Sequence, residues 1–266
     1  IWLPSESNII RLDYKKEECK IFNIGVEFRK FDFINKNQII LVGDNLQVYS
    51  YDLSQQKLEQ FPSAEGPLIL DDTANECSVS KNGTIWITTN KGLLKLDFEN
   101  KKSHYIGLND GFTDDRILCI QEDKSGRLWL GTYLGGVHIY DPATNTVTVI
   151  DDKNGLSNNT VVGILTDEEG YVWASTYNGI TILSPEGKVI SKLYEEQGLS
   201  NNEFNRYSYY KANDGKLIFG SISGINILKP ERIKSTLLVD TSLSIYLTDL
   251  TYYDSQSDIE IHQNSA

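Results

Sequence analysis

Short runs of apolar and alternating residues, separated by turn residues, recur along most of the chain. The stretch from Gly155 to Gln197 contains four of them, TVVGILT, YVWAST, GITIL and VISKLY, with DEEG, YNG and SPEG between them. β-Branched and aromatic residues dominate these runs, and none keeps a helical period over about ten residues. Gly, Asn, Asp and Pro in the connections are typical of tight turns. The pattern predicts four short β-strands in this stretch and no helix.

The same pattern returns at a nearly constant interval. In four successive units a glycine is followed three residues later by a large apolar residue: Trp86, Trp129, Trp173 and Ile218, at intervals of 43, 44 and 45 residues. A second glycine lies six or seven residues after each of them, and two earlier segments, IWLPSESNIIRLD and QIILVGDNLQVYSYD, are weaker copies. Four strands in a unit of about 43 residues are the signature of a β-propeller blade.

We therefore expect an all-β fold: a β-propeller of four-stranded antiparallel blades, with about six blade repeats visible and a ring that need not be complete within this chain. The first strand of each blade, Val161–Thr166 in the unit above, should line the central channel, and the Trp residues should pack between adjacent blades. The first copy begins inside its second strand, and an open ring would leave an edge strand with unpaired backbone groups. Residues 236–250 are expected either to complete that blade or to leave the ring.

The pentapeptide GLSNN occurs at residues 155–159 and 198–202, and GFTDD at residues 111–115 is an altered copy. It marks the passage from the outer strand of one blade to the inner strand of the next. Gly155 and Gly198 are expected to supply a positive φ, and the Ser and Asn residues that follow are expected mainly to hold the turn, with ligand contact as the alternative.

The stretch GLSNNTVVGILTDEEGYVWASTYNGITIL, with its counterpart GFTDDRILCIQEDKSGRLWLGTYLGGVHIYDPATN, resembles the two-component regulator propeller repeat. The resemblance is strong over residues 75–233, weaker over residues 1–74 and only suggestive beyond residue 235. In that family the repeats form the periplasmic sensor of hybrid two-component histidine kinases of glycan-foraging gut bacteria. A small β-sandwich follows the last blade in such proteins, and the segment YLTDLTYYDSQ resembles its opening strand.

The resemblance implies two domains: a propeller over residues 1–232, and, over residues 233–266, a linker with the first strand of a β-sandwich or a propeller-closing segment. It implies the ligand-sensing ectodomain of an inner-membrane protein, which recognises an oligosaccharide and signals to a kinase outside this sequence. A dimer would form through neighbouring domains. The kinase and regulator domains of the family have no counterpart here, so we expect no enzyme activity in these residues.

Charge and composition narrow the range of partners. The formal net charge is −12, with 37 acidic and 25 basic residues, which disfavours nucleic acids and anionic membrane surfaces. The apolar runs are far shorter than the roughly 20 residues that span a bilayer, so we expect no membrane contact by this part. The cysteines Cys19, Cys77 and Cys119 are odd in number and lack CxxC spacing; they are expected to be buried free thiols.

The histidines offer little for catalysis. His104 is expected in a polar turn, His138 in a third strand and His262 in the tail, and no HExxH motif, nucleophile elbow or DxDxDG calcium loop is present. We therefore expect no catalytic residues, no bound metal and no cofactor.

Ligand-binding residues are expected in the loops that meet on one rim, which end in the second glycine or enter the first strand. Amides, carboxylates, arginines and tyrosine faces together suit a carbohydrate, whose hydroxyls need polar contacts while its apolar ring face lies on an aromatic. The candidates are Tyr133, Tyr177, Asn178, Asn90, Lys91, Arg116, Asn202, Glu203, Asn205 and Arg206.

Two other functions remain open. A propeller enzyme of the streptogramin lyase or lactonase type would need a metal or a histidine at the channel mouth, near His138 or His104. A pure protein-interaction propeller would have a large apolar patch on its rim and no small-ligand pocket.

Overall fold

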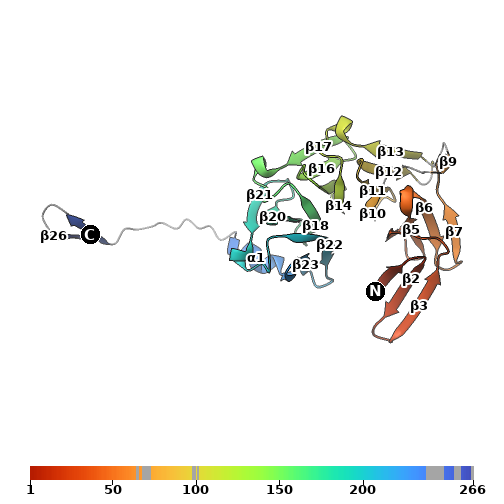
Figure 1. Ribbon diagram of the computed structural model, residues 1–266, viewed down its shortest axis with the longest axis horizontal. Coiled ribbons are helices and arrows are strands. Elements are labelled where there is room, and N and C mark those ends of the chain that lie inside the picture. The colour runs from red at the N-terminus through yellow and green to blue at the C-terminus, as the bar shows by residue number, and fades with distance from the viewer. Residues whose placement is uncertain are drawn as a thin grey trace. The chain divides into compact units, whose positions relative to one another are not determined.

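The computed structural model describes residues 1–63, 66–67, 73–97, 100, 102–237, 249–254 and 259–264. The chain forms two compact units, Ile1–Pro230 and Glu231–Ala266. In the first unit six antiparallel sheets follow one another around a common axis (Figure 1). This arrangement is a β-propeller, and it confirms the predicted all-β fold of about six blades.

Each propeller sheet, or blade, is built from strands that are consecutive in the sequence. The second to fifth blades have four strands each. They comprise β4 (Lys30–Phe33), β5 (Gln38–Val42), β6 (Val48–Asp52) and β7 (Lys57–Gln60); β10 (Ala74–Val79), β11 (Ile85–Thr89), β12 (Leu93–Asp97) and β13 (Lys102–Ile106); β14 (Ile117–Glu122), β15 (Leu128–Thr132), β16 (Val137–Asp141) and β17 (Thr146–Ile150); and β18 (Val161–Thr166), β19 (Val172–Thr176), β20 (Gly179–Leu183) and β21 (Val189–Leu193).

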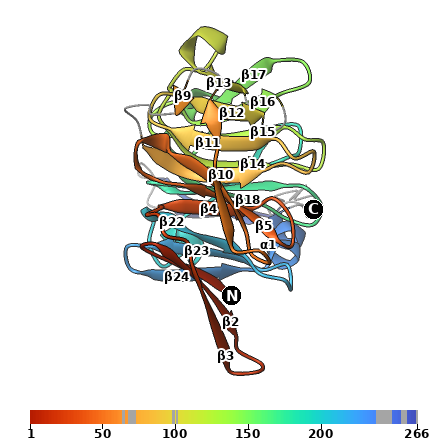
Figure 2. The ribbon, with the colours of Figure 1, turned by 90° about the vertical axis from the view of Figure 1, so that its right-hand side faces the viewer.

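The first and sixth blades have three strands each among the described residues. The first lacks an inner strand, as expected from a copy that begins inside its second strand, whereas the sixth lacks the outer strand that the repeat predicts. The two blades comprise β1 (Trp2–Ser5), β2 (Asn8–Asp13) and β3 (Glu18–Asn23), and β22 (Phe204–Lys211), β23 (Leu217–Ser221) and β24 (Gly224–Leu228). A short pair, β8 (Pro62–Ser63) and β9 (Gly66–Pro67), follows the second blade. In Figure 2 the β2–β3 hairpin projects away from the other sheets.

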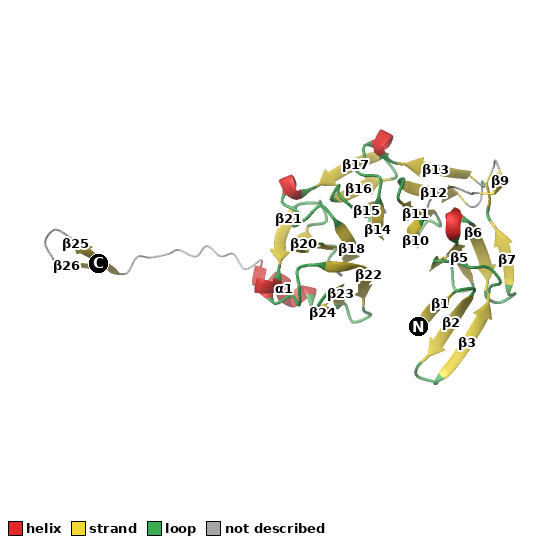
Figure 3. Cartoon of the chain, viewed as in Figure 1, coloured by secondary structure: helices red, strands yellow, loops and turns green. Residues whose placement is uncertain are grey.

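The inner strands β10, β14, β18 and β22 lie toward the centre of the ring, as expected (Figure 1). Short 3-10 turns precede three of them: η2 (Leu108–Asp110), η3 (Asp152–Asn154) and η4 (Glu195–Gln197). Figure 3 shows such helical segments in red on the periphery. Gly155 and Gly198 end η3 and η4 with φ of 97° and 98°, a left-handed conformation that favours glycine. The turn role predicted for these two glycines is confirmed.

The tryptophans pack between blades, as the sequence predicts. Trp86 of the third blade meets Tyr140 of the fourth at 6.1 Å between ring centroids, and Trp129 of the fourth packs with Val161 and Ile164 of the fifth. The buried indole N–H groups have acceptors: Trp129 Nε1 donates to Asp123 Oδ2 at 3.0 Å. Trp173 and Trp86 have equivalent acceptors in Asp167 and Ser80, so each ring is both packed and satisfied in its hydrogen bonding.

Three details differ from the sequence predictions. His104 lies in strand β13 and not in a turn, because the run SHYI alternates well enough to pair with β12. Cys19 is exposed on β3, whereas Cys77 and Cys119 are buried as expected. An α-helix, α1 (Pro230–Leu237), follows the last strand of the propeller.

The second unit contains the hairpin formed by β25 (Asp249–Asp254) and β26 (Ile259–Asn264). The proposed ring-closing or ring-leaving role of residues 236–250 falls mostly on residues outside the described part, and the start of a β-sandwich there stays a prediction.

Candidate functional site

Strand β22 departs from the other inner strands because it contains two extra residues. In β18, Val161 and Ile164 pair with the second strand three positions apart, whereas their counterparts Phe204 and Tyr209 in β22 are five positions apart. Tyr207, within this bulge, has φ of 60°, which is uncommon for a residue other than glycine and costs energy for a bulky side chain. A bulge of this kind changes the direction in which side chains point.

The bulge connects the sixth blade to strands that are far away in the sequence. Arg206 Nη2 donates to Asn75 Oδ1 of β10 at 2.9 Å, and the Tyr207 hydroxyl donates to the same oxygen at 3.3 Å. Asn75 in turn donates through Nδ2 to the carbonyl of Ile117 at 2.8 Å. Lys30 Nζ, from β4, lies 3.7 Å from the centroid of the Tyr207 ring. One amide and one aromatic ring therefore link the inner strands of four blades.

Glu76 is the acidic member of this group. Its Oε2 accepts a hydrogen bond from the Tyr209 hydroxyl at 2.7 Å and another from the Ile120 backbone N–H at 2.9 Å. Burial raises the pKa of Glu76 to about 7, against the lowering effects of these hydrogen bonds and of the Lys30 ammonium. Burial likewise lowers the pKa of Lys30, with Glu76 acting in the opposite direction. The carboxyl group therefore changes its charge near neutral pH.

The Tyr209 ring reaches Glu76 because the neighbouring blade leaves room for it. A Cβ at Gly163 would lie 2.4 Å from Cδ1 of Tyr209, so a larger residue at this position of β18 would displace the ring. Burial and the nearby Glu76 raise the pKa of Tyr209, which keeps its hydroxyl protonated and able to donate. We call Lys30, Asn75, Glu76, Arg206, Tyr207 and Tyr209 the channel cluster.

Two sequence-predicted residues belong to or border this cluster. Arg206 is a member, and Asn90 Oδ1 accepts a hydrogen bond from Asn75 Nδ2 at 3.2 Å. Asn205, beside Arg206, donates through Nδ2 to the carbonyl of Ser221 at 3.0 Å. Lys91 follows Asn90, and its backbone N–H donates to Thr89 Oγ1.

Arg116 and Tyr133 form a separate pair. The Arg116 guanidinium carbon lies 4.6 Å from the centroid of the Tyr133 ring, and Arg116 also pairs with Asp114 at 3.0 Å. The Tyr133 and Tyr177 side chains are 37% and 38% exposed, so both rings are available at the surface. No contact joins these residues to the channel cluster in the hydrogen bonds and ring contacts of the described residues.

The remaining predicted residues take part in turns. Asn202 Oδ1 accepts from the Glu195 backbone N–H at 2.8 Å, which repeats the bond from Asp152 to Asn159 one blade earlier. Asn178 donates through its backbone N–H to Thr176 Oγ1, and Glu203 donates likewise to Asn201 Oδ1. The turn interpretation of GLSNN thus holds for the Asn202 side chain, while Asn178 and Glu203 join turns through their backbone N–H groups. Ligand contact by these three residues stays a prediction.

The sequence analysis missed Lys30, Asn75, Glu76, Tyr207 and Tyr209. The signal for β22 was the length of NNEFNRYSYY, which exceeds the corresponding NNTVVGIL by two residues. The signal for Glu76 was a carboxylate inside an inner strand, where β14 and β18 carry Cys119 and Gly163 at the equivalent register position.

His138 and His104 of the propeller lie away from the channel cluster. His138 is fully buried in β16, and its Nε2 lies 2.9 Å from Thr113 Oγ1. Burial lowers the pKa of His138 to about 4, so the ring is a neutral core group at physiological pH. His104 lies on the outer strand β13. Across the residues that the structure describes, no three His, Cys, Asp or Glu side chains gather as metal ligands would.

No helix in the described residues is long and apolar enough to cross a bilayer.

The chain is similar to proteins of two-component systems. A family model described as two component regulator propeller matches residues 111–134 and 155–178. Histidine kinase P4 of Formosa agariphila is 27% identical over 171 residues, which cover 62% of this chain and 12% of that kinase. The chain therefore spans about an eighth of its curated relative.

Among solved structures, the extracellular domain of a protein named as a hybrid two-component system of B. thetaiotaomicron has a TM-score of 0.74 and 21% identity, covering 98% of this chain and 36% of that one. A second such domain from the same organism has a TM-score of 0.67 and 19% identity, covering 85% and 30%. At these identities the likeness shows a shared fold.

The enzyme alternative has weaker support. Streptogramin B lyase has a TM-score of 0.64 and 12% identity, covering 100% of this chain and 79% of that one. This likeness again concerns the fold, and His138 and His104 lie on the third and fourth strands of their blades, not on inner strands. The chain is thus similar to two-component regulator propeller repeats over residues 111–134 and 155–178.

Proposed function

We propose that this chain is the ligand-sensing part of a periplasmic, extracytoplasmic sensor of a hybrid two-component system, and that it binds an oligosaccharide at the channel cluster. The proposal rests chiefly on the bulge of β22, which breaks the blade repeat and places Arg206 and Tyr207 against β4 and β10. Strained backbone positions of this kind are found preferentially where a protein binds or acts. The repeat match and the sensor relatives support the biological role.

The chemistry of the cluster suits a sugar. Arg206 Nε is buried and has no hydrogen-bond acceptor among the described residues, and a buried donor without an acceptor is costly. A hydroxyl oxygen of a ligand would supply that acceptor. Tyr207 is 51% exposed. Lys30 Nζ lies over its ring, so the apolar side of a pyranose ring would pack on the part of the ring that Lys30 leaves open.

The position of the cluster suits signalling as well. A ligand that contacts Tyr207, Asn75 and Lys30 touches three blades at once, so its binding energy acts on their relative positions. In our proposal this change passes to a kinase outside this sequence, with a dimer formed through neighbouring domains, and the chain itself has no enzyme activity.

Calorimetry against a panel of neutral and acidic oligosaccharides tests the proposal. For a sugar that binds, Tyr207→Ala should raise the dissociation constant at least about tenfold, which corresponds to a loss of about 1.4 kcal/mol of binding free energy. Tyr14→Ala is the matched control, because Tyr14 is 72% exposed and lies in the β2–β3 turn. A panel without any binder, or a Tyr207→Ala variant that binds as tightly as the unmodified chain, would contradict the site.

A further inference from the structure

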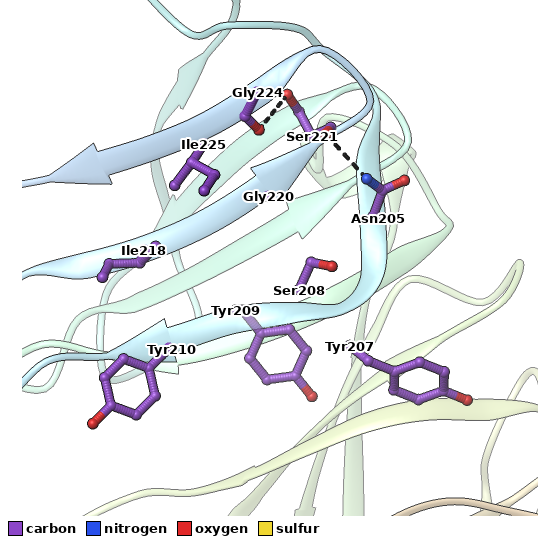
Figure 4. Close-up of a pocket in the computed structure, with 10 residues that line it drawn as sticks. All are labelled: Asn205, Tyr207, Ser208, Tyr209, Tyr210, Ile218, Gly220, Ser221, Gly224 and Ile225. Carbon is purple, nitrogen blue, oxygen red and sulfur yellow. Dashed lines mark hydrogen bonds between the residues drawn. The ribbon is translucent and has the colours of Figure 1, made fainter. Parts of the chain in front are cut away.

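Two positive groups share one aromatic ring in the channel cluster. Lys30 Nζ of β4 lies 3.7 Å from the centroid of the Tyr207 ring, and the Arg206 guanidinium carbon of β22 lies 5.1 Å from the same centroid. Figure 4 shows the Tyr207 ring projecting from β22 on the side away from Gly220 and Ser221. Burial lowers the pKa of Lys30, and the Arg206 charge lowers it further. The two cations are therefore close enough to repel each other.

Neither cation has an ion-pair partner in the part of the chain that the structure describes. The ion pairs found there, within 4.0 Å, join other basic residues to carboxylates, as in the pair of Arg116 with Asp114. The chain has 37 acidic residues against 25 basic ones, so carboxylates are not scarce. The charges of Lys30 and Arg206 thus lie together without compensation, which favours the binding of an anionic group between them.

The carboxyl groups in this part of the channel are held by other donors. Glu76 Oε2 accepts two hydrogen bonds, at 2.7 and 2.9 Å, from a tyrosine hydroxyl and a backbone N–H. Asp32, two positions after Lys30 on β4, accepts from the backbone N–H groups of Val79 and Phe33, both at 2.7 Å. These bonds fix both carboxyl groups within the fold, and the two cations stay available to a ligand.

The hydrogen bonds of Arg206 support the same conclusion. Its Nη2 donates to Asn75 Oδ1 at 2.9 Å and to the Tyr207 hydroxyl oxygen at 3.0 Å, and both acceptors are neutral. Its buried Nε has no acceptor among the described residues. Hydrogen bonds from an arginine to a carboxylate are roughly twice as strong as those between neutral groups. A carboxylate therefore gains more from this guanidinium than a sugar hydroxyl does.

We propose that the ligand of the channel cluster is an acidic oligosaccharide, and that Lys30 and Arg206 bind the carboxylate of one of its uronic acid residues. This inference rests on the proposed function, to which it adds the charge of the ligand. The carboxylate of a uronic acid lies at the edge of the pyranose ring, so a sugar packed on Tyr207 can direct it toward the cations beside that ring. Lys30 and Arg206 then determine specificity, because a neutral sugar leaves their charges uncompensated.

Matched sugar pairs separate the charge of the ligand from its shape. Each pair consists of an acidic tetrasaccharide, from polygalacturonate, alginate or hyaluronan, and the same tetrasaccharide after reduction of its carboxylates to primary alcohols. We expect calorimetry at pH 7 to find an acidic member that binds at least about tenfold more tightly than its reduced partner.

Substitutions of Lys30 connect this preference to the site. Lys30→Gln should lower the ratio of the two affinities at least about threefold, whereas Lys30→Arg, which keeps the charge, should largely retain it. Lys36→Gln is the matched control, because it removes the same charge from an exposed position in the turn after β4. This control should leave the ratio unchanged.

Glu76→Gln should have an effect of the opposite sign. The Glu76 carboxylate and a bound carboxylate interact with the same Lys30 charge. The variant should therefore bind the acidic member more tightly than the unmodified chain does, and the reduced member with unchanged affinity.

The outcomes separate this inference from the proposed function. If the reduced members bind as tightly as the acidic ones and Tyr207→Ala weakens both, the sugar site stands and the acidic ligand is refuted. Binding of neutral sugars alone, or an equal effect of Lys30→Gln and Lys36→Gln on the ratio, refutes it as well. If no acidic or neutral oligosaccharide binds, both proposals fail.

Discussion

Glu76 is a residue at which one blade differs from the other repeats and thereby places a charged group among the inner strands. At the equivalent register positions β14 and β18 carry Cys119 and Gly163, which are small and uncharged. Glu76 instead places a carboxyl group where Tyr209, Ile120 and Lys30 converge. Asp32 of β4 also lies near it, and burial raises the pKa of Asp32 as well. The charge at the centre of the channel is therefore sensitive to pH.

The raised pKa of Glu76 leads to a prediction about stability. The pKa of about 7 in the folded chain exceeds the ordinary value of 4.5, so folding favours the protonated form. This contribution is fully present below pH 4.5 and is lost as the pH rises through 7; its upper limit is about 3 kcal/mol. Glu76→Gln should thus reduce the fall in melting temperature between pH 5 and pH 9.

Thermal unfolding at pH 5, 7 and 9 provides the measurement. Gln retains an oxygen that can accept from Tyr209 and Ile120, so the variant should still fold. Glu18→Gln, an exposed position on β3, is the matched control and should keep the pH dependence of the unmodified chain. Parallel pH profiles for Glu76→Gln and the unmodified chain would refute the assignment.

At the scale of elements, turn chemistry explains why most strands could be predicted. Each predicted run of the unit 155–197 became one strand, because its flanking Gly, Asn, Asp and Pro residues end the pairing locally. The bulge of β22 carries no such local mark. Tyr207 adopts a positive φ without being glycine, and its partners Asn75 and Lys30 are more than a hundred positions away in the sequence. Contacts between residues so far apart produce no recurring pattern in the sequence from which they could be predicted.

Removal of the β22 bulge tests whether it is needed for oligosaccharide binding. Deletion of Arg206 and Tyr207 would restore the three-residue spacing of β18 between Phe204 and Tyr209. We expect the sixth blade to keep its pairing with β23, and the melting temperature to stay within a few degrees, since the lost contacts are offset by about 1 kcal/mol or more of relieved backbone strain. Oligosaccharide binding should disappear in calorimetry. A variant that still binds would move the site elsewhere, with Tyr133 and Arg116 as the next candidates.

For the molecule as a whole, the sequence repeat explains the four-stranded second to fifth blades, and the first and sixth blades are the exceptions, with three strands each among the described residues. The spacing of Gly and Trp predicts the order of blades because each Trp needs both a neighbouring sheet and a hydrogen-bond acceptor. The sixth blade lacks both the tryptophan and its hydrogen-bond acceptor. Ile218 replaces the tryptophan, and Ala212 occupies the position at which Asp123 and Asp167 accept the indole N–H in the fourth and fifth blades. The position of Trp2 predicts that the first blade lacks its inner strand, whereas the three-stranded sixth blade was not predicted.

The difference between interior and end blades predicts an asymmetry in stability. Trp129 is fully buried between the fourth and fifth blades, so Trp129→Ala should lower the free energy of unfolding by about 3–5 kcal/mol. Ile218, at the equivalent position of the sixth blade, is only half-buried, and Ile218→Ala should cost less, about 1 kcal/mol. Denaturant unfolding of both variants, followed by far-UV circular dichroism, measures the two values. Equal losses would mean that Ile218 is fully covered in solution, because only a fully buried Ile218 could contribute as much as an interior position of the ring.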